Sequence, residues 1–154
     1  MNKLFFFILF VLFISVTDFI SAQGIYITKL NDLNFGDVFI GYSKDLPHTD
    51  INAAKFRFYH TANSTKTIFI NCTIQKTLSK LIDQSPIIFD QSNTDLTYTD
   101  KTSGRTNFNP YSRYKIKNIR AKRNVYIWLG ANLPASGGVS FGLYEGTIIL
   151  TVEY

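Results

Sequence analysis

The chain has 154 residues, of which 45% are hydrophobic and 16% aromatic, a composition that excludes a disordered polypeptide. Lys and Arg outnumber Asp and Glu by 16 to 11, and the net charge of +5 favours acidic partners or surfaces. The single cysteine, Cys72, excludes an internal disulfide, and we expect it to be a small buried apolar residue within a strand.

The beginning of the chain is expected to lie outside the fold. Lys3 precedes an apolar run over residues 4–16, and Ala22 then supplies a small residue. This pattern is typical of a cleaved secretory signal peptide, and the run is shorter than the ~20 residues that a membrane-spanning helix needs. We therefore expect residues 1–22 to be a signal peptide and residues 23–154 to form one exported domain in the periplasm, at the cell surface or outside the cell. No integral membrane segment is expected after cleavage.

Segments rich in β-branched and aromatic residues follow one another through the remaining chain, with turn residues between them. No helical periodicity separates them, which favours antiparallel pairing over a parallel α/β sheet. The one exception is residues 77–84, where we expect a helical turn. The sequence therefore predicts an all-β, immunoglobulin-like antiparallel β-sandwich. The predicted strands cover residues 25–30, 33–41, 55–59, 66–74, 86–89, 114–119, 125–129 and 142–154.

The longest polar stretch, residues 91–109, is expected to be a long loop or a weak hairpin around Tyr98. Long loops on a rigid sandwich are common places for binding. Asp90, Asp95 and Asp100 are spaced five residues apart here, but this spacing does not match a calcium-binding EF-hand loop. We interpret the three side chains as solvated carboxylates.

No pattern in the sequence indicates catalysis. His48 and His60 lack a metal-ligand spacing with Cys72, and no HExxH, CxxC or glycine-rich phosphate loop occurs. No pair of carboxylates resembles the pair of a glycosidase. We therefore expect a protein that is not an enzyme and that uses no metal or cofactor.

The last residues of the chain, 142–154, alternate between apolar and polar side chains, which is the pattern of a half-buried strand. Such a strand either fills the inside of its own sandwich or presents an edge with which another chain pairs. The candidate strand-pairing residues are Gly142, Tyr144, Ile148, Leu150, Val152 and Tyr154.

A basic run with no acidic residue lies between Lys101 and Glu145. We interpret it as the solvated face of an outer strand, where lysines also discourage edge pairing. The alternative is an attraction to an anionic surface polymer or to an acidic partner. Nucleic acid is not expected as a partner because the chain carries an export signal. The candidate basic surface consists of Arg113, Lys115, Lys117, Arg120, Lys122 and Arg123.

Both ends of the chain resemble a bacterial exported domain family of unknown function that is related to spore coat protein U and to chaperone–usher fimbrial subunits. The opening match is residues 25–38 (IYITKLNDLNFGDV). The resemblance to fimbrial subunits implies that a periplasmic chaperone, and then another subunit, completes the sheet by adding a strand. Residues 23–30 are then either a donated strand or an ordinary first strand. The closing match is Gly142, Tyr144, Gly146, Thr147, Thr151, Val152 and Tyr154.

A second resemblance concerns residues 33–41 (LNFGDVFIG), which are similar to the start of immunoglobulin-like domains in secreted bacterial and cilium-associated proteins. It implies a spacer or scaffold domain. From these patterns we expect a secreted structural or adhesive protein of the fimbrial-subunit type that acts through β-strand pairing. The alternative is a module that binds a surface polysaccharide or another polymer through exposed aromatic rings such as Tyr98, Tyr111 and Trp128.

Overall fold

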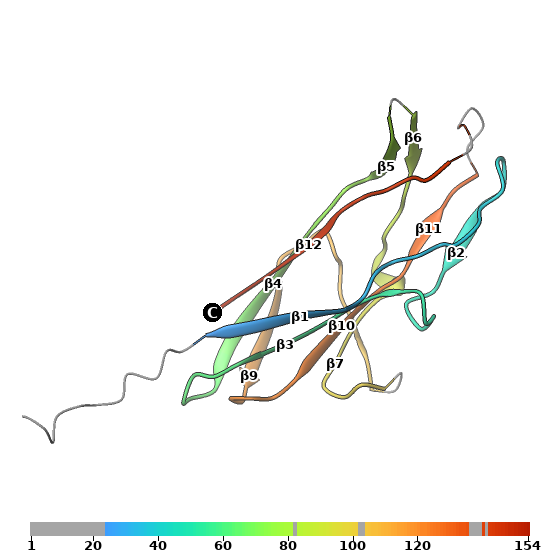
Figure 1. The fold of residues 1–154 in the computed structure, drawn as a ribbon. Helices are drawn as coiled ribbons and strands as arrows, with labels where there is room; N and C mark the ends of the chain where they lie inside the picture. Colours follow the sequence, from blue (N-terminus) through green and yellow to red (C-terminus); the bar gives the residue numbers. More distant parts are fainter. Residues whose placement is uncertain (1–23, 82, 102–103, 136–139, 141) are drawn as a thin grey trace, which may run out of the picture.

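The computed structural model describes residues 24–81, 83–101, 104–135, 140 and 142–154. These residues form several antiparallel sheets and contain no α-helix (Figure 1). The prediction of an all-β antiparallel sandwich is therefore confirmed. The expected signal peptide, residues 1–22, lies outside the described residues.

The larger sheet consists of five antiparallel strands. In β3 and β10, Phe58 and Ile127 are fully buried and face the core, whereas the intervening Arg57 and Trp128 lie on the outer face and are partly buried. This alternation is the reason the two segments form central strands. The spatial order is β1 (Ile25–Asn31), β3 (Ala54–His60), β10 (Val125–Leu129), β7 (Thr94–Thr97) and β8 (Thr106–Asn107).

The smaller sheet contains β12 (Ile148–Glu153), β4 (Lys66–Ile74) and β9 (Tyr114–Ile119), in that order. The register between β12 and β4 places Leu150 opposite Cys72. Cys72 is a free thiol and only 7% exposed, as predicted, and burial raises the pKa of this thiol to about 12.

Two short antiparallel pairs extend the sandwich at one end (Figure 1). The first joins β2 (Lys44–Leu46) to β11 (Ala131–Leu133), and the second joins β5 (Thr77–Lys80) to β6 (Asp83–Pro86). A single 3₁₀ turn, η1 (Gln91–Asn93), leads into β7.

The core lies between the two main sheets and is built from apolar side chains of both. Phe58, Val125 and Ile127 of the larger sheet and Ile68 of the smaller sheet are 0% exposed. Each such side chain contributes about 1.5–3 kcal/mol through its removal from water. This packing holds the two edge strands, β1 and β12, close together on one side of the sandwich.

Three predicted elements differ from the structure. Residues 33–41 are not a strand, and residues 77–84 form the β5–β6 hairpin instead of a helical turn. The predicted strand 86–89 is replaced by the end of β6 and an isolated bridge between Ile88 and Asn132. Positive φ values at Gly36 and Gly41 turn the first segment, and local pairing makes the second a hairpin. Only the bridge of Ile88 depends on a partner far away in the sequence.

The polar stretch 91–109 does contain a hairpin, but its first strand belongs to the central sheet. All side chains of β7 are buried, and β7 pairs with β10 on one side and β8 on the other. The interpretation of Asp95 as a solvated carboxylate is therefore wrong. Its Oδ2 lies 2.6 Å from His48 Nε2 and 3.3 Å from Arg105 Nη1, so the buried carboxylate is paired through this one oxygen.

Candidate functional site

One side of the sandwich is open. The larger sheet ends at β1 and the smaller sheet ends at β12, and these two strands touch without pairing. Within the described part of the chain, no strand pairs with the outer edge of β12. A sheet edge of this kind presents a row of unpaired backbone N–H and C=O groups.

Side chains on the inner side of both edge strands are incompletely covered. Ile27 of β1 lies opposite Phe58 in register, so both face the core, yet Phe58 is 0% exposed and Ile27 is 44% exposed. Ile148, Leu150 and Val152 of β12 pack against the core but are also only partly buried. The sandwich therefore lacks cover beside the outer edge of β12, where a further strand would pair.

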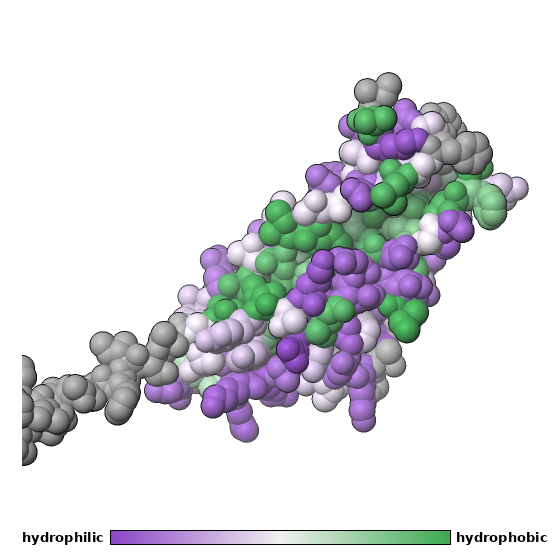
Figure 2. Space-filling model, viewed as in Figure 1, coloured by the Kyte–Doolittle hydropathy of each residue, from purple (hydrophilic) through white to green (hydrophobic). Residues whose placement is uncertain are grey.

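A groove of about 1010 Å³ continues this open side toward the end that carries the two short strand pairs. Figure 2 shows apolar side chains exposed along the length of this face. One wall is formed by residues 31–36 and 38–42, and the other by β5 and residues 142–148. The floor consists of core side chains, namely Ala54, Phe56, Ile74, Ile87, Phe89 and Leu133.

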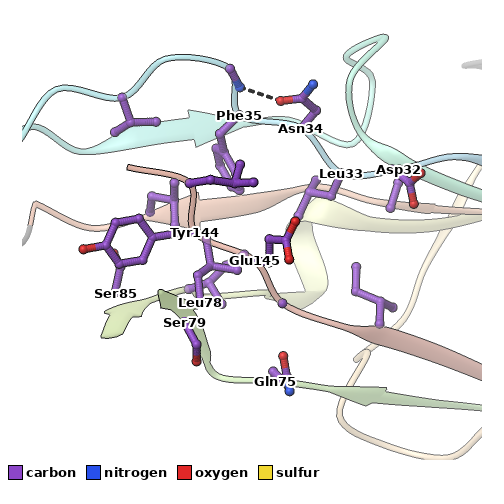
Figure 3. Close-up of a pocket in the computed structure, with 18 of the residues that line it drawn as sticks. Asp32, Leu33, Asn34, Phe35, Gln75, Leu78, Ser79, Ser85, Tyr144 and Glu145 are labelled. Atoms are coloured by element: carbon purple, nitrogen blue, oxygen red, sulfur yellow. Dashed lines mark hydrogen bonds between the residues drawn. The ribbon is translucent and has the colours of Figure 1, made fainter. Parts of the chain in front are cut away.

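The two walls face each other with apolar side chains. Leu33 and Phe35 project from one wall, and Leu78 and Tyr144 lie on the other (Figure 3). At the groove mouth, Phe39 is 76% exposed, so apolar surface continues beyond the floor. An exposed, contiguous apolar region on a folded domain indicates a place where another molecule is bound.

The polar groups at the rim are mostly engaged by the chain itself. Gln75 Oε1 accepts a hydrogen bond of 2.8 Å from the backbone of Thr147, and Asn34 Oδ1 accepts one of 2.8 Å from Gly36 (Figure 3). Ser79 and Glu145 form an isolated backbone bridge across the far wall. The groove therefore offers an apolar floor and apolar walls beside a strand edge, and part of its polar lining is already hydrogen-bonded within the chain.

The structure divides the predicted terminal strand into two parts. Ile148, Leu150 and Val152 lie on the inner side of β12 as expected. Residues 142–147 are not part of the strand, so the prediction of one strand over 142–154 is wrong for Gly142 and Tyr144. Both residues nevertheless line the groove.

Local contacts explain why the strand begins late. Gly142 has φ +141, a conformation that favours glycine, and it lies against the side chain of Lys80. The Tyr144 hydroxyl donates a hydrogen bond of 3.0 Å to the carbonyl of Ser140. Ser140 also donates to Asp83, which holds the pKa of that carboxyl below its ordinary value. These contacts fasten the segment to the β5–β6 hairpin instead of to β4.

Tyr154 follows the last residue of β12 and lies at the opposite end of that strand. Its ring meets the edge of buried His60 at 6.2 Å between centroids, and Lys66 Nζ lies 5.4 Å from its centroid. Tyr154 therefore packs against its own domain, and the candidate strand-pairing residues are not collected into a single cluster.

The candidate basic residues are found in two places. Arg113, Lys115 and Lys117 lie on or next to β9 at the outer face of the smaller sheet, and Arg120, Lys122 and Arg123 follow in the turn to β10. Arg113 forms an ion pair of 2.5 Å with Glu153. Arg123 lies over the ring of Tyr98, with its guanidinium carbon 4.1 Å from the ring centroid. Its neighbour therefore differs from that of Arg113.

The three aromatic rings considered for polymer binding have separate surroundings. Lys55 Nζ covers Trp128 at 4.1 Å, and Arg123 covers Tyr98. The Tyr111 hydroxyl accepts a hydrogen bond of 3.4 Å from the backbone of Phe89. The rings of Trp128 and Tyr98 thus each have one face occupied by a cation, which leaves less open surface for stacking a sugar.

Sequence reasoning missed the wall formed by residues 31–42. The density of apolar residues in this segment predicts a strand, but Gly36 and Gly41 both have positive φ values, 59° and 81°. These glycines were the available signal that the segment turns instead of extending.

The described residues provide no group of three or more His, Cys, Asp and Glu side chains arranged to hold a metal ion. In the same part of the chain, none of the elements is a helix with the length and apolar character needed to cross a membrane.

In comparisons with known proteins, no protein-family model matches this chain, and no curated protein matches it.

Proposed function

We propose that this protein is an exported structural or adhesive subunit with an immunoglobulin-like sandwich, and that a strand from another protein chain adds to the outer edge of β12. The observation that carries this proposal is the incomplete cover of Ile27 on β1 and of Ile148, Leu150 and Val152 on β12, next to an apolar groove that Ile148 lines. The resemblance of both chain ends to fimbrial-type proteins supports the same function.

Strand addition supplies both kinds of stabilisation that the open side lacks. Main-chain hydrogen bonds to β12 satisfy its edge, and apolar side chains at alternate positions of the added strand fill the groove. Each apolar side chain that becomes fully buried contributes about 1.5–3 kcal/mol before the cost of ordering the strand.

The added strand comes from another molecule, because the chain's own first strand is occupied within its domain. A free peptide of residues 23–32, with Ile25 and Ile27 at alternate positions, serves as a model of the added strand. Residues 25–31 are already paired with β3 over most of their length, as an ordinary first strand. Deleting these residues is expected to expose Phe56 and Phe58 and to destabilise the fold. A loss of binding by the deletion variant would therefore not distinguish strand addition from unfolding. A periplasmic chaperone or a second subunit is the class of partner that covers such an edge before and during assembly.

Two neighbouring substitutions test the proposal. Ile148 points into the groove, whereas Ile149 points to the outer face and is 53% exposed. We expect Ile148→Lys to abolish binding of a fluorescent peptide with the sequence of residues 23–32, because it places a charge in the apolar lining of the groove. Ile149→Lys, the matched control, retains the binding of the unsubstituted protein.

Fluorescence anisotropy and size-exclusion chromatography with light scattering provide the measurements. An unsubstituted protein that stays monomeric at every concentration and ignores the peptide contradicts strand addition and favours a spacer domain. Equal binding by both lysine variants also contradicts it.

A further inference from the structure

The outer face of the smaller sheet carries a second surface that is independent of the groove. It lies on the side of the sheet turned away from the core, and its basic residues belong to β9 and the turn that follows. We define the basic face as Arg113, Lys115, Lys117, Arg120 and Lys122.

A bulge in β9 places these side chains outward. Ile116 pairs with Ile68 and Ile119 pairs with Lys66, so β9 has one more residue than β4 in this interval. Asn118 absorbs the extra residue with φ +58. Ile116 and Ile119 therefore both remain buried, while Lys117 between them is exposed. Bulges of this kind are features that redirect side chains and are frequent next to functional sites.

An aromatic ring orders the other end of the basic face. The Arg113 guanidinium carbon lies 4.0 Å from the centroid of Phe69, and Lys115 Nζ lies 5.7 Å from it. Cation–π contacts of this type hold long basic side chains in a defined direction without neutralising their charge. Lys115 and Lys117 are spaced about 6.6–6.8 Å apart along the strand, given the rise of ~3.3–3.4 Å per residue.

Among the described residues, most cationic side chains of the basic face form no ion pair with a carboxylate. Glu153 pairs with Arg113, but within the described residues no carboxylate forms an ion pair with Lys115, Lys117, Arg120 or Lys122. The face therefore keeps a positive potential toward solvent, which attracts a polyanion. A second copy of this chain, with the same net charge of +5, does not provide the required negative surface.

We propose that the basic face binds a linear acidic polysaccharide. Arg113, Lys115 and Lys117 stand at every second position before the bulge, and such a row of cations fits a partner whose negative charges also repeat along a line. The neighbouring outward side chains are Asn71 and Thr73 of β4 and Thr151 of β12, which supply the amide and hydroxyl groups that pair with sugar hydroxyls. Phe69 is covered by Arg113, so it offers no open ring for stacking a nucleic-acid base.

The test uses the protein produced from its full sequence and a fluorescently labelled heparin fragment as the acidic polysaccharide. We expect binding in low salt that weakens as salt screens the charges. The double variant Lys115→Gln/Lys117→Gln raises the dissociation constant by about tenfold or more, because it removes two unpaired cations from the face. Lys115→Arg/Lys117→Arg keeps the affinity within about twofold, because the charge remains.

The matched control is Lys76→Gln/Lys101→Gln, which removes the same charge from two exposed lysines elsewhere. We expect its affinity to stay within about twofold of the unsubstituted protein, because the charge loss lies away from the face. The proposal is overturned if both glutamine variants weaken binding equally, since net charge alone is then responsible. It is also overturned if single-stranded DNA with the same number of charges competes as well as heparin, or if neutral dextran does. Because the groove is unchanged in these variants, the result does not depend on strand addition.

Discussion

At the scale of single residues, the least expected feature is the buried charge of Asp95. This residue is 2% exposed, and its carboxylate contacts His48 and Arg105, which connects β7 to the segments before and after it. Asn93 adds to the same cluster, because its Oδ1 accepts a hydrogen bond of 2.5 Å from the backbone N–H of His48. Spacing in the sequence could not show this cluster, because its members come together only when β7 enters the central sheet.

The Asp95 cluster gives the first prediction. Asp95→Ala leaves the side chain of Arg105, which is only 15% exposed, without a carboxylate, and we expect it to lower the free energy of unfolding by about 3–5 kcal/mol. Urea denaturation measures this loss. Asp100→Ala is the control, because Asp100 pairs with Lys55 at the surface and its removal costs about 0–1 kcal/mol. Similar losses in the two variants contradict the structural role of Asp95.

Cys72 gives a second prediction at this scale. Since burial raises the pKa of its thiol to about 12, the folded protein holds almost no thiolate at about pH 8, and alkylation by iodoacetamide is expected to be slow until urea unfolds the chain. Mass spectrometry of timed samples follows the reaction. Rapid modification of the folded protein would falsify the burial of this residue.

The same shift predicts how stability depends on pH. The folded-state pKa lies above the ordinary value of 9.0, so the unfolded chain loses the thiol proton first as the pH rises. The contribution of Cys72 to stability is therefore complete below about pH 9 and is lost toward pH 12. Cys72→Ser should show a smaller loss of stability across this interval in chemical denaturation, because serine does not ionise there.

At the scale of elements, the sequence predicted the strands that alternate clearly. The bounds expected for residues 55–59, 66–74, 114–119 and 125–129 agree with β3, β4, β9 and β10 to within a residue or two. These segments carry apolar side chains toward the core at every second position, except at the bulge of β9, and this alternation is a local property of the sequence.

The sequence did not predict the short strand pairs, one of which joins distant segments while the other is a local hairpin. β2 and β11 have three residues each and pair with one another across most of the chain, and the β5–β6 hairpin turns at Leu81, a non-glycine residue with φ +50. Neither has the length or the turn residues that a sequence pattern requires.

The open position of β12 leads to a prediction about this element. Val125 of β10 is 0% exposed, whereas Val152 of β12 is partly buried beside the open edge. We expect Val125→Ala to cost about 2–3 kcal/mol and Val152→Ala less than half of that in the monomer. Thermal and urea denaturation compare the two variants, and equal costs would show that β12 is already covered.

At the scale of the whole molecule, the two edges of the smaller sheet have opposite characters. The β12 edge borders an apolar groove, whereas the β9 edge carries exposed lysines that discourage pairing with another strand. The proposed strand addition is therefore expected at the β12 edge, and we expect the basic face to stay exposed when it occurs.

The sequence predicted the sandwich and the inner side of β12, but it could not locate the groove. Alternation in residues 148–153 shows that one side of the strand is apolar, but it does not show which strands lie beside it. The groove results from the spatial order β1-β3-β10 and β12-β4-β9, which leaves both sheets ending on the same side.

Amide hydrogen exchange along β12 tests the central claim most directly. In an antiparallel edge strand, alternate N–H groups point toward β4 and toward the open side. We predict alternating slow and fast exchange over residues 148–153 in the monomer. The fast amides should become protected when the peptide of residues 23–32 is added to the unsubstituted protein or to Ile149→Lys, and not when it is added to Ile148→Lys. Uniform protection of β12 in the monomer, or no change on adding the peptide, would contradict the account.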